Sequence, residues 1–268
     1  MKILSLLTIL LVSATAFAQY EDPDSISRLQ LHMGVGFYMA NDDLAVYYSG
    51  ADNNRFNQVL TNSYTEAQIR ESLGGFDFSL LEAPANFIYR NQVSFLLGGA
   101  YNVNKNWSVI AQLQQVKLEA AGTFTLRVER SNQQNNNQDY IEQCSILGKE
   151  RRSHFQLGGA WRTPLNPSFY FKIGAGLDIN TTEVLENKIY IGNSEFSLPA
   201  ATINQPNAGE ITTSGLGFFI MPDISYENQK GLGIFIRTTY VRTKVSLNKV
   251  TEDVTSAWIP AFGFSWSF

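Results

Sequence analysis

The sequence predicts an all-β fold, an eight-stranded antiparallel transmembrane β-barrel with long extracellular loops, the first of them partly helical. Three observations favour this fold: apolar residues alternate with small or polar ones over eight segments, aromatic residues flank the short turns, and short connections alternate with long ones. Eighteen Phe, twelve Tyr and twenty Gly accompany only 16% charged residues, against about 25% in an average soluble protein. The net charge of -4 argues against nucleic acid as a partner.

Residues 1–18 are expected to be a cleaved signal peptide. Lys2 supplies a positive start, Ile3 to Val12 is almost wholly apolar, and Ala16-Phe17-Ala18 matches a cleavage site. The apolar run is shorter than the roughly 20 residues that span a bilayer. Residues 19–268 are then one barrel domain. Its single cysteine, Cys144, cannot build a disulfide framework, so a closed ladder of backbone hydrogen bonds must supply stability.

Period-two alternation marks the strands. The segments are 28–37, 93–102, 107–118, 154–162, 169–178, 216–224, 232–240 and 257–268. In the third segment the alternation slips at Gln114-Gln115, which predicts a β-bulge. A soluble lipocalin-like barrel is the alternative, but the polar faces are rich in glycine and poor in lysine and glutamate, so a lipid-facing exterior is favoured.

The connections define the two ends of the barrel. Long ones are expected at about 41–88, 127–150, 186–212 and 248–254, and short ones at 102–106, 163–168 and 227–231. Outer-membrane barrels have short periplasmic turns and longer outer loops. An even strand count therefore places both chain ends on the periplasmic side.

The last residues carry a family resemblance. Aromatic residues at every second position end on a terminal phenylalanine: Phe262, Phe264, Trp266 and Phe268. This pattern resembles the assembly signal of bacterial outer-membrane barrels, which implies an outer-membrane location and recognition by the barrel-assembly machinery. The whole chain resembles small barrels such as the OmpA membrane domain, OmpX and OmpW, and is closer still to the porin-like, PorT-like barrel group. No catalytic motif comes with the resemblance.

The inward faces are expected to form a polar lumen network. Its predicted members are Arg28, His32, Gln112, Lys172, Asp178, Asp223 and Arg237. Asp178 and Asp223 would pair with Lys172, Arg237 or Arg28, since buried charges need partners. A filled polar core is favoured at eight strands, and a narrow proton or ion path is the alternative.

Nothing in the sequence predicts an enzyme, a metal site or a cofactor. His32 and His154 both face inward, and Ser153 beside His154 faces the opposite side of its strand. Neither histidine forms a recognisable catalytic constellation.

The first long connection is the main functional candidate. Phe56, Val59, Leu60, Tyr64 and Ala67 recur at helical spacing, and Gly74-Gly75 would end a helix. Ile69 falls on the other side, and Ser63 with Glu66 has capping-box spacing, so one bent helix or two short ones are possible. The apolar stripe is either a lid on the barrel or a docking surface for a protein partner or an apolar ligand.

The second long connection is Asn/Gln-rich over residues 131–139, which indicates a solvated tip. Arg151 and Arg152 at its base would bind lipopolysaccharide phosphates or simply be a solvated strand end. The leading hypothesis is a non-enzymatic outer-membrane protein whose loops dock a partner. The PorT-like resemblance suggests a subunit of a secretion, assembly or adhesion complex. The alternative is a small channel for a small or apolar solute, gated by the first connection.

Overall fold

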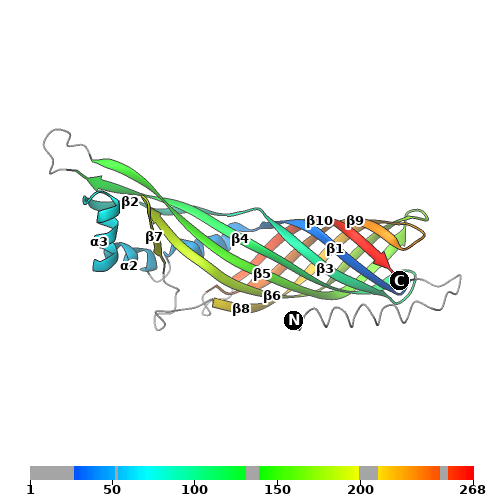
Figure 1. The fold of residues 1–268 in the computed structure, drawn as a ribbon. Helices are drawn as coiled ribbons and strands as arrows, with labels where there is room; N and C mark the ends of the chain where they lie inside the picture. The colour runs from blue at the N-terminus through cyan, green and yellow to red at the C-terminus, as the bar shows by residue number, and fades with distance from the viewer. Residues whose placement is uncertain (1–26, 52–53, 131–138, 199–210, 248–252) are drawn as a thin grey trace, which may run out of the picture.

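Eight antiparallel strands close into a barrel, as predicted. The computed structural model describes residues 27–51, 54–130, 139–198, 211–247 and 253–268. The predicted signal peptide and the Asn/Gln-rich tip at 131–138 lie outside these residues. The barrel strands are β1 (Leu29–Ala40), β3 (Gln92–Asn102), β4 (Trp107–Glu129), β5 (Tyr140–Pro164), β6 (Phe169–Ile191), β8 (Ile211–Glu227), β9 (Leu232–Val245) and β10 (Asp253–Ser267) (Figure 1).

The ring closes through β1, which pairs with β3 on one side and β10 on the other. At the end of the seam, Phe268 N donates to Leu29 O at 2.8 Å. Every other barrel strand pairs with its neighbours in chain order. A closed ring leaves no strand edge exposed, which a barrel in lipid requires.

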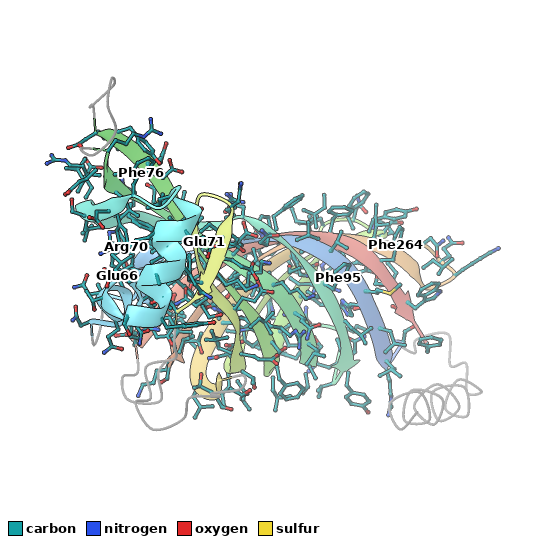
Figure 2. The ribbon with its side chains drawn as sticks, turned by 60° about the vertical axis from the view of Figure 1, so that its left-hand side comes forward. Glu66, Arg70, Glu71, Phe76, Phe95 and Phe264 are labelled. Atoms are coloured by element: carbon teal, nitrogen blue, oxygen red, sulfur yellow. The ribbon has the colours of Figure 1, made fainter. Side chains whose placement is uncertain are left out.

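The half of the barrel near the short turns is apolar outside and polar inside. Phe95, Leu177 and Ile236 point outward and are 67%, 64% and 70% exposed. Figure 2 shows Phe95 and Phe264 projecting from this outer wall. Between them on each strand lie inward residues, among them the buried His32 and Arg237. This arrangement suits lipid outside and a packed polar lumen within.

Near Gln114, the apolar residues of β4 change from the outward face of the strand to the inward face. Up to Leu113, outward residues of β4 are apolar; from Gln115 on they are polar, while the inward residues Val116 and Leu118 are apolar and buried. The pairing with β3 and β5 continues through this point without a shift. The predicted β-bulge is therefore wrong. The apolar face turns inward here because the strand leaves lipid and enters water.

Beyond this boundary, β4, β5 and β6 continue far outside the ring. The predicted long connections at 127–150 and 186–212 are thus partly strand. Two further strands, β2 (Asp77–Arg90) and β7 (Ser194–Ser197), extend this sheet by pairing with β4 and β6. Together with the helices of the first connection, this part forms a compact extension that we call the head.

Three short helices cover the inner face of the head: η1 (Asp42–Ser49), α2 (Arg55–Thr61) and α3 (Ser63–Ser72) (Figure 1). The helical stripe is therefore two helices, not one bent helix. Asn62 caps α3, since its side chain accepts from the Tyr64 and Thr65 amides. Ser63 was predicted to cap this helix and instead lies inside it. No helix among the described residues has the length and apolarity to span a membrane.

Candidate functional site

The lower lumen, nearest the short turns, holds a charged layer around Arg237. Its guanidinium lies 3.0 Å from Asp223, donates to Gln112 Oε1 at 3.0 Å and to His32 Nδ1 at 2.8 Å. It also stacks on the Phe235 ring, 3.9 Å from the centroid. Each of these residues faces inward because it alternates along its strand with apolar residues that face outward. The charges are paired as burial requires.

Lys172 belongs to the same layer and donates to Gln30 Oε1 at 3.0 Å. The cavity among His32, Lys172, Asp223 and Arg237 measures about 20 Å³. This volume is about that of a single water molecule. Among the described residues, the lower lumen is therefore closely packed by its own side chains.

A second layer lies above it and contains His154. The Nδ1 atom of His154 lies 3.0 Å from Asp178, Nε2 lies 3.0 Å from the Tyr38 hydroxyl, and Gln156 donates to Asp178 at 3.1 Å. Asp178 was predicted to pair with Lys172, Arg237 or Arg28, and that pairing is wrong. An Asp–His pair can move a proton in an enzyme; here both side chains are 0% exposed inside the barrel.

The barrel mouth is closed by a third polar layer. Glu150 accepts from the Tyr48 hydroxyl at 2.5 Å, from Tyr89 at 3.1 Å and from Arg152 Nε at 2.5 Å. Tyr48 lies on η1, and Asp42 of the same helix accepts from the Tyr89 amide at 2.6 Å, so two hydrogen bonds hold η1 in the barrel mouth as a plug. Desolvation, followed by the nearby Glu150 carboxylate, raises the pKa of both Tyr48 and Tyr89 well above the ordinary value.

Sequence reasoning missed the mouth layer, although a signal existed. Glu150, Arg152 and His154 alternate along β5, which places all three on one face of the strand. Arg152 was considered as a lipopolysaccharide ligand, but it is buried inside the barrel at 0% exposure. Arg151 faces outward and pairs with Glu183 at 2.8 Å.

Most of the charged residues predicted for the lumen lie there, and one does not. His32, Lys172, Asp178, Asp223 and Arg237 are all buried inside the barrel. Arg28 is exposed and precedes β1, so its assignment to the lumen is wrong.

The C-terminal aromatics all lie on the outer wall. Phe262, Phe264, Trp266 and Phe268 are exposed there on alternate positions.

The predicted docking stripe is mostly core. Phe56, Val59 and Leu60 are buried at 4–7% exposure, and the Phe56 ring meets Phe124 of β4 edge-on at 4.9 Å. These three residues are therefore unavailable to a partner, and as a docking surface the stripe is wrong for them. They pack α2 against the head sheet. Tyr64 and Ala67 of the same stripe are exposed on α3.

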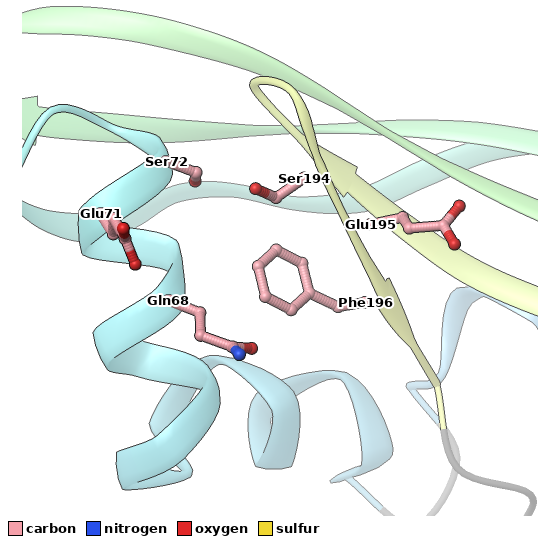
Figure 3. Close-up of a pocket in the computed structure, with 6 residues that line it drawn as sticks. All are labelled: Gln68, Glu71, Ser72, Ser194, Glu195 and Phe196. Atoms are coloured by element: carbon pink, nitrogen blue, oxygen red, sulfur yellow. The ribbon is translucent and has the colours of Figure 1, made fainter.

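A groove of about 440 Å³ lies beside α3, between this helix and β7. Figure 3 shows Gln68, Glu71 and Ser72 on the helix side and Ser194 and Phe196 on the strand side. The helix is held against the start of β2 by Arg70, which pairs with both Glu66 and Asp77 (Figure 2). The groove is open, polar and on the head, so it is more accessible than the buried layers of the lumen.

Aromatic residues ring the apolar wall at both ends. Those beside the short turns are Tyr101, Trp107, Trp161, Phe169, Tyr226 and Trp266, and those near the boundary at Gln114 are Phe37, Phe155, Phe218, Tyr240 and Trp258. Two such girdles flanking an apolar band on a closed antiparallel ring mark the two interfaces of a bilayer. The fold is that of a small outer-membrane β-barrel.

Known proteins are only distantly similar to this chain. No family model and no curated protein matches the chain. Among solved structures, Neisserial surface protein A is 9% identical, over 90% of this chain and 97% of that one, with a TM-score of 0.47. Ail, the attachment invasion locus protein of Yersinia pestis, is 11% identical over 90% and 100% of the two chains, with a TM-score of 0.39. OprG of Pseudomonas aeruginosa is 12% identical over 90% and 97%, also with a TM-score of 0.39.

Proposed function

We propose that this chain is a non-enzymatic outer-membrane protein whose head docks a partner, and that the groove between α3 and β7 is the docking surface. The contrast between lumen and head supports this proposal. Three hydrogen-bonded layers fill the lumen, whereas the groove is open and large enough for part of a polypeptide. A place in a secretion, assembly or adhesion complex belongs to the same proposal.

The exposed face of α3 leads into the groove. Tyr64 is 72% exposed, and Ala67, Gln68 and Glu71 follow at one-turn spacing. Interface energy concentrates on a few residues, among which tyrosine is enriched. Phe196 forms an apolar base and Glu71 supplies a carboxylate, so a polypeptide segment with a basic residue matches the groove.

Site-directed crosslinking in native outer membranes tests the docking surface. A photoreactive amino acid at Ala67 should give a discrete adduct, because this position faces outward beside the groove. The same amino acid at Gln143, exposed on β5, is the control and should give none. Combining Tyr64→Ala with Glu71→Gln should abolish the adduct. Equal adducts from both positions, or an adduct that survives the double substitution, would contradict the proposal.

A small channel gated by the first connection is the second candidate. Polar side chains line the lumen along its length, and Tyr48 of η1 reaches into its mouth. Planar-bilayer recordings separate the two functions. The docking proposal expects the wild-type protein and Tyr48→Ala to be equally silent, because the Arg237 layer still fills the lumen. Steady conductance by the wild type, lost when Arg237 or Asp223 is replaced by a bulky apolar residue, would favour the channel.

A further inference from the structure

The outer wall of β9 carries an arginine at the level where the barrel leaves the membrane. Arg242 is exposed and pairs in register with Phe218 of β8 and Ser256 of β10. The outward residue one position nearer the membrane centre on β9 is Tyr240. Arg242 therefore stands at the outer rim of the apolar band, where lipid headgroups meet the protein.

Three aromatic rings lie beside and beneath this arginine on the outer wall. Tyr240 is 4.8 Å from Trp258 and 6.4 Å from Phe218, measured between ring centroids. Trp258 and Phe218 are 52% and 43% exposed on the lipid-facing wall. The three rings thus form a continuous apolar surface that runs from the arginine toward the bilayer centre.

Two cations on the outer wall of β5 differ from Arg242 because carboxylates neutralise them. Arg151 pairs with Glu183 at 2.8 Å and Lys149 with Glu186 at 3.0 Å. Among the residues that the structure describes, no carboxylate pairs with Arg242. Its positive charge is therefore open to an anion from outside the protein.

We propose that Arg242, with Phe218, Tyr240 and Trp258, binds a phosphorylated lipid of the outer leaflet. A guanidinium binds phosphate through two parallel hydrogen bonds, which suits an anionic headgroup at this depth. The rings would contact the upper acyl chains of the same lipid. A free phosphate ion has no apolar part to occupy that surface, and a zwitterionic lipid brings its own cation to compete with the arginine.

Native mass spectrometry tests which lipid stays bound. The full protein is released from phosphatidylcholine vesicles that contain a minority of phosphatidic acid. The wild type should retain phosphatidic acid, and Arg242→Gln should retain it about tenfold less, because a charge-assisted bidentate pair is lost. Arg151→Gln is the matched control and should behave as the wild type. Equal retention by wild type and Arg242→Gln would overturn the proposal.

Tryptophan fluorescence gives a second measurement that does not depend on release from the membrane. Trp258 lies near the outer boundary, while Trp107, Trp161 and Trp266 lie beside the short turns. A quencher near the headgroup of phosphatidic acid should quench Trp258 more than the same quencher on phosphatidylcholine, and Arg242→Gln should remove the difference. Millimolar inorganic phosphate should not compete. Competition by free phosphate, or a difference that survives in Arg242→Gln, would overturn the proposal.

Discussion

At the residue scale, two glycines decide how the head closes the barrel. An ideal Cβ at Gly148 would lie 2.0 Å from the Tyr48 ring, and one at Gly122 would lie 2.5 Å from the Phe87 ring. Both glycines face inward on long strands, so each leaves a space that an aromatic ring fills. The position of η1 therefore depends on the space at Gly148 as well as on the hydrogen bond between Tyr48 and Glu150.

Gly148→Ala should therefore displace Tyr48 and loosen η1. Overpacking of this kind costs about 1–3 kcal/mol. Limited proteolysis should then cut within residues 42–49, where the wild type resists. Gly159→Ala on the same strand is the control, because its Cβ would meet no atom closer than 4.0 Å. Equal protection of Gly148→Ala and wild type would show that the plug does not rely on this space.

The buried tyrosines predict how the stability of the head depends on pH. The pKa values of Tyr48 and Tyr89 are raised in the folded protein, whereas unfolded tyrosine ionises near pH 10. Their contribution is complete below about pH 10 and is lost as the pH rises toward the folded pKa values.

Urea unfolding of the head between pH 8 and pH 12 measures this contribution. The contribution of Tyr48 and Tyr89 to the urea concentration at the midpoint of unfolding should be constant up to about pH 10 and should fall above it. Replacing both tyrosines with phenylalanine should flatten that fall. A fall of the same size in the phenylalanine variant would assign it to other groups.

At the scale of the elements, the alternation along β4 and β5 shows which residues share a face of the strand. It does not show whether that face meets lipid, water or the interior of the protein. The sequence therefore predicted the eight barrel strands and, apart from Arg28, the inward and outward sides of their residues as far as Gln114. It misplaced their outer ends, because the exchange of apolar and polar faces at Gln114 looked like a slip in register. Only the position of the neighbouring strands separates the two interpretations.

A pair of substitutions on β5 tests the boundary. Leu157 faces lipid at 47% exposure, and Ser153 faces outward just beyond the last apolar position. Leu157→Arg should destabilise folding into vesicles by about 2–4 kcal/mol, and Ser153→Arg by about 0–1 kcal/mol. Heat-modified gel mobility across a urea series reports both values. Equal costs at the two positions would move the boundary away from Ser153.

The helices of the first connection show a second limit of sequence reasoning. The helical spacing correctly indicated an apolar stripe, and it left lid and docking surface open. What covers Phe56, Val59 and Leu60 is the inner face of the head sheet, including Phe124. A periodic pattern reveals an apolar face but not its partner when that partner lies on a distant strand. Tyr64 and Ala67 escaped burial because α3 turns away from α2 at Asn62.

At the scale of the whole molecule, the barrel is held by a closed ring outside and by charged layers inside. The lower layer makes a clear prediction. Arg237→Met leaves Asp223 buried without its cation and should cost about 3–5 kcal/mol. Combining it with Asp223→Leu should recover much of that loss, because neither charge remains unpaired. Urea unfolding in vesicles measures the cycle. A double variant no more stable than Arg237→Met would show that the ion pair does not carry the effect.

The unequal strand lengths have a consequence for reach. Tyr140, at the start of β5, is thirteen residues beyond Ser153. That length corresponds to about 43 Å of strand, or about 30 Å of height at the usual tilt. Among the described residues, the wall of β4–β6 rises beyond β9, so the head stands over one side of the barrel and leaves a low rim at β9. A large soluble protein bound to the head would lie above the lipid surface and leave the rim at β9 free. The head could then bind a protein while Arg242 binds a lipid.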